Sequence, residues 1–125
     1  MKQGFVKVAS ATPRIRVADP VYNAQVICEQ AKEAAEHGAK IVVFPELCIT
    51  GYTCNDLFLQ ELLLEKAKEA LLTIAEETGQ LETLFLVGLP VDKDGRLYNV
   101  AAVLYRGRIL GMIPKKNIPM YAEFY

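Results

Sequence analysis

Two residues of this 125-residue chain are of types that could do chemistry together, and each follows a proline after an apolar run. Glu46 comes after Pro45 and the run Ile41–Phe44, while Lys115 comes after Pro114, 69 residues further along the chain (115 − 46). In open α/β sheets ligands bind beyond the carboxyl ends of the strands, so two such side chains can converge on one site. A carboxylate can take the proton of a nucleophilic thiol, and an ammonium can stabilise the anionic intermediate that follows. The pair therefore suits hydrolysis by a thiol.

The spacing of these two charges leaves other interpretations open. Glu46 and Lys115 could form a purely structural ion pair, or they could be two unrelated charges on the surface, because most loop acids are solvated. Residue types and spacing do not by themselves decide between these alternatives and a catalytic pair.

The three cysteines, Cys28, Cys48 and Cys54, lack the spacing of metal ligands. Cys28 falls on an apolar helical stripe and is predicted to lie in the core. Cys48 and Cys54 follow Glu46 closely, but His37 is the only histidine, so no histidine partner is at hand to activate either thiol. In a reducing compartment all three are expected to be free thiols.

Composition narrows the class of protein. The formal net charge is −1, with 52% hydrophobic and 23% charged residues, as in ordinary soluble globular proteins. A charge this close to zero gives no reason to expect nucleic acid or an anionic membrane as a partner. With no apolar run of about 18 residues and no signal peptide, we expect a cytoplasmic protein without a membrane span. The chain stops at an aromatic pair, Phe124-Tyr125, which suggests a fragment cut in mid-fold.

The first half of the chain predicts a strand, a helix and a second strand. Residues 5–11 alternate apolar with small or polar side chains and predict a strand. Asp19-Pro20 is a strong helix start, and Gly38 is its stop, with an alanine-rich apolar stripe between them. The strand 41–44 follows after a short return. This order predicts a βαβ unit and hence a parallel pair of strands.

The second half predicts one more helix and three strands. The helix is expected from Asn55 or Asp56 to about Thr78. Its predicted core face is leucine-rich and its predicted solvated face is mostly glutamate: the first comprises Leu59, Leu62, Leu63, Leu71 and Ile74, and the second Glu61, Glu65, Lys68, Glu69 and Glu76. A buried strand, 84–90, is followed by a turn over residues 92–95. Two further strands are predicted, 98–105 and 108–113, joined as a hairpin through Arg106-Gly107. The fold class is therefore α/β, as one structural unit.

Two groups of motifs carry a resemblance to a known family. Phe44–Leu47, followed by Thr50–Tyr52 and later by Pro114-Lys115, resembles the nitrilase (carbon–nitrogen hydrolase) superfamily, which works with a Glu–Lys–Cys triad. Further blocks narrow the match: Asp56–Phe58, Arg106–Arg108, Ile118-Pro119 and Tyr121–Tyr125. Together they resemble, over essentially the whole chain, the N-terminal glutaminase domain of bacterial glutamine-dependent NAD synthetases.

The resemblance implies a fold and two catalytic roles. The fold is the first half of an αββα sandwich, with helices on one face of a mixed sheet whose other face pairs with later strands. Residues 1–125 would form a partial carbon–nitrogen hydrolase (glutaminase) domain. Glu46 resembles the general base, and Lys115 resembles the lysine that stabilises the oxyanion. Lys116 is the rival to Lys115, but it does not directly follow the proline, and we assign it to solvent or backbone support.

Three aromatic residues resemble the lining of a glutamine pocket: Tyr52, Tyr121 and Phe124. For both tyrosines, core packing with a satisfied hydroxyl remains an alternative. Met120 departs from the family, which usually has a polar residue there. The nucleophilic cysteine of the family lies well beyond position 125, so we expect this piece to be inactive by itself.

In the intact parent, the resemblance implies hydrolysis of glutamine to glutamate and ammonia. The ammonia would pass to a synthetase domain of the same polypeptide that converts deamido-NAD to NAD with ATP and magnesium. No metal or cofactor is expected in the present domain. Two alternatives stay open: a stand-alone amidase acting on another small amide, and a catalytically dead assembly domain. A half-sandwich should also expose apolar surface, so we expect self-association into a homo-oligomer.

Overall fold

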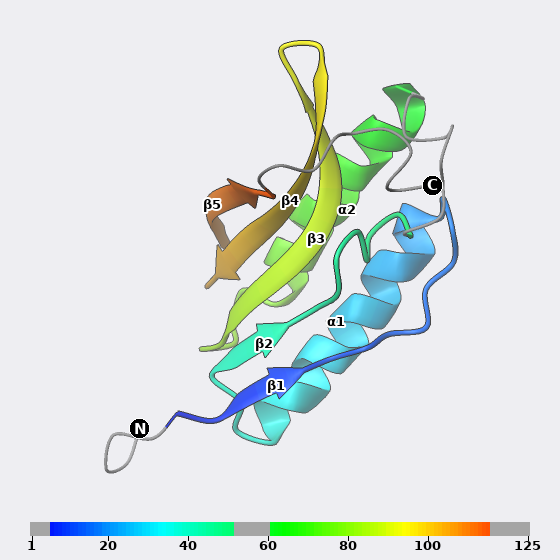
Figure 1. Ribbon diagram of the computed structural model, residues 1–125. Helices are drawn as coiled ribbons and strands as arrows, with labels where there is room; N and C mark the ends of the chain where they lie inside the picture. Colours follow the sequence, from blue (N-terminus) through cyan, green and yellow to red (C-terminus); the bar gives the residue numbers. More distant parts are fainter. Residues whose placement is uncertain (1–5, 52–60, 116–125) are drawn as a thin grey trace.

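The computed structural model describes residues 6–51 and 61–115, and two helices and five strands lie within these ranges. In chain order they are β1 (Val8–Ser10), α1 (Pro20–Glu36), β2 (Ile41–Val43), α2 (Glu61–Glu77), β3 (Leu84–Lys93), β4 (Arg96–Tyr105) and β5 (Arg108–Pro114). The strands form one five-stranded sheet in the order β1-β2-β3-β4-β5. Both helices lie behind this sheet in Figure 1. The predicted α/β fold is confirmed.

Helix α1 begins and ends where the sequence predicts. The Asp19 carboxylate accepts a hydrogen bond from the backbone N–H of Tyr22 at 3.1 Å, and Pro20 occupies the first turn. The helix ends at Glu36, and the Gly38 N–H donates to the Ala35 carbonyl at 3.0 Å. Four residues of its predicted apolar stripe are buried, namely Ala24, Ile27, Cys28 and Ala31, while Ala34 and Ala35 near the helix end are only partly buried. The alanines on this stripe let the helix approach its neighbours closely.

The sheet is mixed, because its first three strands are parallel and the last two reverse direction. β1 pairs with β2, and β2 with β3, in parallel register, as the predicted βαβ unit requires. β3–β4 and β4–β5 are antiparallel. The second hairpin turns through Arg106 and Gly107, both at positive φ (53° and 82°). Positive φ at both central residues is typical of the tight turns that suit the twist of a hairpin.

The turn between β3 and β4 is shorter than predicted. We expected β3 to end at Pro90, but the ladder continues until Lys93 pairs with Arg96. Only Asp94 and Gly95 form the turn, with φ of 54° and 77°. Asp94 and Gly95 are enough to form a two-residue turn, so Asp92 and Lys93 can remain in the strand.

Helix α2 confirms most of the predicted core face. Leu63, Leu71 and Ile74 are buried, and all five residues predicted for the solvated face are exposed: Glu61, Glu65, Lys68, Glu69 and Glu76. The prediction for Leu62 was wrong, since it is 67% exposed. Successive residues of a helix are rotated by about 100°, and Leu62 lies on the side of Leu63 that faces away from Leu64 and Ala67, outside the buried stripe of α2. The predicted start at residues 55–56, and Leu59, lie outside the described residues.

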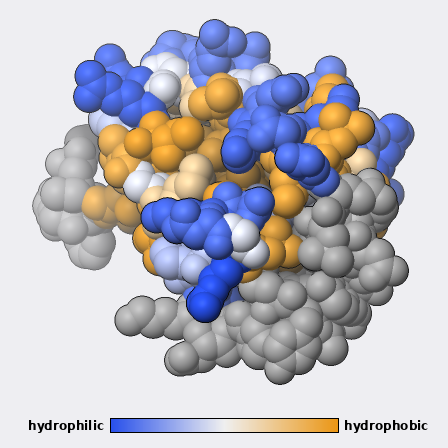
Figure 2. Space-filling model, turned by 90° about the horizontal axis from the view of Figure 1, so that it is seen from above, coloured by the Kyte–Doolittle hydropathy of each residue, from blue (hydrophilic) through white to orange (hydrophobic). Residues whose placement is uncertain are grey.

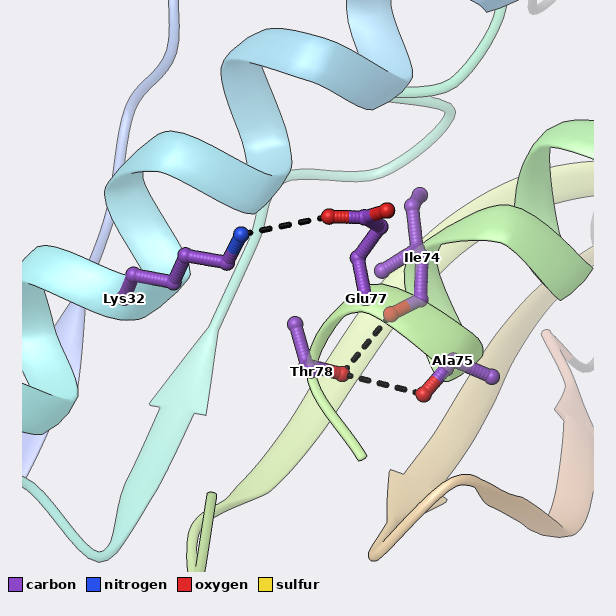
Figure 3. Close-up of polar contacts among 5 residues, drawn as sticks. All are labelled: Lys32, Ile74, Ala75, Glu77 and Thr78. Atoms are coloured by element: carbon purple, nitrogen blue, oxygen red, sulfur yellow. Dashed lines mark hydrogen bonds and ion pairs between the residues drawn. The ribbon is translucent and has the colours of Figure 1, made fainter. Parts of the chain in front are cut away.

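The end of α2 is held to α1 and to its own last turn (Figure 3). Lys32 on α1 forms an ion pair with Glu77 on α2 at 3.2 Å. The Thr78 hydroxyl donates to the Ile74 carbonyl at 2.7 Å, and this carbonyl also accepts from the Thr78 N–H at 3.0 Å. Thr78 is buried, so this bond also removes a polar group that would otherwise be unsatisfied.

The two faces of the sheet have different surroundings. Side chains that point toward the helices are buried: Val42, Phe85, Val87, Leu89, Ala102 and Leu104. Their neighbours along the strands point the other way, and Val8, Val43 and Ile113 among them are exposed although apolar. Seen from above in Figure 2, hydrophobic patches (orange) lie between hydrophilic ones (blue) on the surface. Among residues 6–51 and 61–115, therefore, helices cover one face of a mixed sheet and leave an apolar second face open, as expected for half of an αββα sandwich.

A helix that crosses a membrane must be about 20 residues long and apolar over that length. Neither α1 nor α2 meets that requirement.

Candidate active site

Glu46 lies where the chain leaves the sheet beyond β2. The Phe44 N–H donates to the Leu86 carbonyl at 2.9 Å, and the Ile49 N–H donates to the Gly88 carbonyl at 3.2 Å. Between these two bonds lie four residues, 45–48, on one side and only Val87 on the β3 side. The four residues must therefore arch out of the ladder, and Glu46 is on this arch.

The arch passes directly against the backbone of β3 at Gly88. A Cβ atom at Gly88 would lie 2.5 Å from the Leu47 nitrogen and 2.8 Å from the Pro45 oxygen. Such distances are shorter than real carbon contacts, and the opposing atoms are backbone. Only glycine fits here without moving the Glu46 segment. We did not single out Gly88 from the sequence, although a glycine inside an apolar strand is a signal of close backbone approach.

Two hairpins bring Lys115 to the same edge of the sheet as Glu46. Because β4 reverses β3 and β5 reverses β4, β5 runs in the direction of β2, and both end at one edge. β2 and β5 are three strands apart, about 14 Å at ordinary strand spacing. The arch over β3 shortens this separation, and the Lys115 ammonium forms an ion pair with Oε1 of Glu46. The structure thus brings together the two side chains that the sequence singled out.

The pair remains accessible. The side chains of Glu46 and Lys115 are 40% and 42% exposed. A hollow of about 390 Å³ on one side of Glu46 is lined by Pro13, Ile15 and Cys48, and a second, of about 270 Å³, contains Asn99 and Lys115. A small amide could therefore approach the carboxylate. The three predicted pocket aromatics, Tyr52, Tyr121 and Phe124, lie outside the described residues, as does Lys116.

Asn99 also contacts this pair. Its side-chain amide donates to Oε2 of Glu46 at 3.4 Å, and its carbonyl accepts from the Lys115 N–H at 2.9 Å. We did not single out Asn99 from the sequence. Asn99 could have been noticed as a polar residue that precedes the apolar run of β4, a position where a buried polar side chain needs a partner.

Neither described cysteine is placed to act as the nucleophile. Cys48 is buried, and its thiol donates to the Gly88 carbonyl at 3.7 Å; burial raises its pKa to about 12. Cys28 is buried on α1, on the helix side of the sheet, where burial and then the negative charge of Glu77 raise its pKa to about 11. Both are free thiols, as predicted. Cys54 lies outside the described residues.

These raised pKa values predict low reactivity. The thiolate is the reactive form, and a thiol whose pKa is 11 or 12 stays protonated at pH 8. We expect Cys28 and Cys48 to resist iodoacetamide at pH 8 in the folded protein and to be alkylated fully in urea. Peptide mass spectrometry would measure each site separately. Rapid modification of Cys48 in the folded protein would show that the arch opens readily.

The loop after Glu46 is tied to α1 by one buried side chain. Asn23 accepts from the Arg16 N–H and donates to the carbonyls of Arg16 and Ile49, each at 2.7 Å. The Ala18 N–H also donates to the Thr50 carbonyl at 2.7 Å. The first turn of α1 thus connects the segment before it with the arch that carries Glu46.

Replacing Asn23 by leucine should therefore destabilise the protein. The three backbone groups would lose their partner, and at the buried bond to the Ile49 carbonyl an unsatisfied group costs about 1–3 kcal/mol. We expect the free energy of unfolding in urea to fall by at least about 2 kcal/mol. Gln25→Ala, at an exposed position of the same helix, should change it by less than about 0.5 kcal/mol. Equal effects of the two substitutions would contradict this role of Asn23.

A metal site in a protein needs several histidine, cysteine or carboxylate side chains close together. Within residues 6–51 and 61–115, no three or more histidine, cysteine, aspartate or glutamate side chains are grouped so that they could hold a metal ion.

Comparison with known proteins agrees with the fold and the motifs. The family model described as carbon-nitrogen hydrolase matches residues 7–123. The glutamine-dependent NAD(+) synthetase of Mycobacterium tuberculosis (strain ATCC 25618 / H37Rv) is 40% identical over 124 residues, which are 99% of this chain and 18% of that protein.

Solved structures give the same result. The crystal structure of a glutamine-dependent NAD(+) synthetase from Cytophaga hutchinsonii superposes with a TM-score of 0.85 at 30% identity, covering 91% of this chain and 19% of that one. The NitN amidase of Neterenkonia sp. AN1, at 24% identity and a TM-score of 0.76, shares the fold over 93% of this chain and 47% of its own. The chain spans about a fifth of the length of the synthetases that it matches. It belongs to the carbon-nitrogen hydrolase family.

Proposed function

We propose that this chain is part of a glutaminase that hydrolyses the side-chain amide of glutamine by a thiol mechanism and supplies ammonia for ATP-dependent conversion of deamido-NAD to NAD. The observation that carries the proposal is the Glu46–Lys115 pair at the carboxyl edge of the sheet. The relatives with 40% identity in sequence and with 30% identity in a solved structure are both glutamine-dependent NAD(+) synthetases. ATP and magnesium would act in a synthetase domain, outside these residues.

The pair can serve both halves of the reaction. In the first half, the Glu46 carboxylate takes the proton of the thiol, the sulfur attacks the amide carbon, and the proton passes to the leaving ammonia. In the second half, Glu46 removes a proton from water, which attacks the γ-glutamyl thioester and releases glutamate and the thiol. An ammonium has three N–H donors, so Lys115 can keep one on Glu46 and offer another to the oxyanion.

The nucleophile must come from elsewhere in the complete polypeptide. Cys28 and Cys48 are buried with raised pKa values, and the family resemblance places the reactive cysteine after Tyr125. We therefore expect residues 1–125, expressed alone, to release no ammonia from glutamine above the blank. Release that Glu46→Gln abolishes would show that the chain holds its own nucleophile.

The open apolar face of the sheet predicts the state of association of the same 125-residue piece. Exposed apolar side chains, among them Val8, Val43 and Ile113, would gain by contact with a second copy. We expect sedimentation velocity to show dimers or larger species whose fraction rises with concentration. A monomer at every concentration would contradict this expectation.

The complete protein allows a direct test of the proposed function. With [¹⁵N-amide]glutamine, deamido-NAD, ATP and magnesium, we expect labelled NAD and one glutamate for each ammonia released. A panel of other small amides, such as butyramide and propionamide, should be hydrolysed much more slowly. Preference for one of those amides without NAD formation would favour a stand-alone amidase. No hydrolysis of any amide would favour an assembly domain without catalysis.

A further inference from the structure

Asn99 occupies a position that links both members of the Glu46–Lys115 pair. It lies on β4 and is 3% exposed. Its side-chain Nδ2 donates to Oε2 of Glu46 at 3.4 Å, while its backbone oxygen accepts from the Lys115 N–H at 2.9 Å. One residue therefore contacts the carboxylate at its side chain and the lysine at its backbone.

Asn99 is a polar residue among buried apolar ones. Its neighbours Val100 and Ala102 are buried apolar residues of the same strand. A buried amide without a hydrogen-bond partner destabilises the fold, so a buried asparagine needs a partner for its side chain. The bond to Glu46 supplies that partner, and none of the buried side-chain nitrogens or oxygens among the described residues lacks one.

The two contacts on Glu46 fall on different oxygens. Lys115 meets Oε1, and Asn99 meets Oε2. Two donors on the two oxygens fix the plane of a carboxylate, whereas one donor would leave it free to rotate about its last torsion. A general base needs this orientation, because a misplaced proton acceptor loses much of its effect.

We infer that Asn99 is a positioning residue for the reaction: its amide orients the Glu46 carboxylate, and its carbonyl holds the backbone that presents Lys115. This inference rests on the proposed function. Asn99 does not touch the substrate in this role but acts through the two charged residues.

Two substitutions of similar size separate positioning from packing. Asn99→Leu removes the donor, and Asn99→Asp replaces it by an acceptor of nearly the same shape. In the complete protein we expect kcat for ammonia release from glutamine to fall about 10- to 100-fold in both, with a smaller change in KM, as for loss of a hydrogen bond to a charged group.

Thr83→Val is the matched control. Thr83 is also a buried polar residue, and its hydroxyl donates to the Ala39 carbonyl at 3.0 Å, away from Glu46. We expect it to lower the Tm while kcat stays within about twofold of the unchanged protein. An equal loss of kcat in Thr83→Val would mean that any buried polar contact matters, and would overturn the inference.

The pH profile gives a second signature. The ionisable residues lining the hollow with Asn99 are Glu46 and Lys115. In Asn99→Asp the new carboxylate repels Glu46 when ionised, but it can donate a hydrogen bond when protonated. The loss of kcat in Asn99→Asp, relative to the unchanged protein, should therefore shrink as the pH falls from about 8 toward 5. The loss in Asn99→Leu should stay constant over this range.

A stability measurement, which does not depend on enzymatic activity, tests this inference separately from the proposed function. The Tm shifts of Glu46→Ala, Asn99→Leu and the double variant form a double-mutant cycle. We expect the double shift to be smaller than the two single shifts together, because both remove the same contact. If Glu46→Gln retains full hydrolysis, the proposed function fails, and the cycle still tests the contact. Additive shifts, or kcat of Asn99→Leu within twofold of the unchanged protein, would overturn the positioning role.

Discussion

Glu46→Gln should remove glutamine hydrolysis from the complete protein, with a fall in kcat of about 10²–10⁴-fold or more. Glutamine has nearly the shape of glutamate, so the arch and its contacts should persist. Its amide nitrogen and oxygen, however, cannot take a proton from the thiol or from water. The effect falls on both half-reactions, because Glu46 is the proton acceptor in each. A coupled assay for glutamate would measure the loss.

Two controls show that the loss is chemical rather than structural. NAD formation from free ammonia should continue in Glu46→Gln, since that reaction does not need the amide to be hydrolysed. Glu82→Gln makes the same chemical change at an exposed acid that pairs with Arg106 at 3.4 Å, before β3 begins. It should keep kcat within about twofold. Undiminished glutamine hydrolysis in Glu46→Gln would contradict the role of general base.

Gly88→Ala should have the second large effect, although this residue carries no functional group. The added Cβ would lie 2.5 Å from the Leu47 nitrogen, 2.8 Å from the Pro45 oxygen and 3.0 Å from the carbonyl carbon of Glu46. These are backbone atoms, so the arch itself must move away from β3. A displacement of about 1 Å at a reacting group can cost about 10²-fold in rate. We expect kcat for ammonia release to fall by that order, together with a loss of stability from overpacking of about 1–3 kcal/mol.

Gly111→Ala is the control for this substitution. Gly111 lies on β5 of the same sheet, and a Cβ there would meet no atom within 4 Å. It should therefore fold and turn over glutamine normally. Steady-state kinetics and urea unfolding of the two variants would show whether the loss comes from position 88 or from any replacement of glycine by alanine in the sheet. Normal activity in Gly88→Ala would show that the arch can shift without moving the carboxylate.

Much of the fold follows from local patterns in the sequence. Asp19-Pro20 starts α1 because the aspartate can cap the first turn and the proline has no N–H to lose there. The turn residues of the second half predict a turn over residues 92–95 and a hairpin through Arg106-Gly107. Both connections are present, although Asp94 and Gly95 alone form the first. The prediction of burial failed where two neighbouring residues are both apolar and only one of them faces the core. Leu62 was assigned to the core on its type alone, yet the buried stripe passes through Leu63 instead.

The candidate site could be predicted only in part. Two prolines marked the ends of apolar strands, so Glu46 and Lys115 could be named from the sequence and expected at one edge. Gly88 and Asn99 could not be connected with them in this way. Their proximity depends on the pairing of β3 with β4 and on the path of the arch, which join residues far apart in the chain.

The sequence by itself determined the order of strands and helices, the parallel pairing of the first two strands, the last hairpin, and the placement of an acid and a lysine at strand ends. These are properties of short segments and of the number of chain reversals between them. Only the tertiary structure decided how Glu46 reaches a lysine three strands away. It does so because Gly88 lacks a side chain, which lets the arch lie against β3, and because Asn99 offers a donor from β4. Such contacts are set by non-local packing, and no local pattern specifies them.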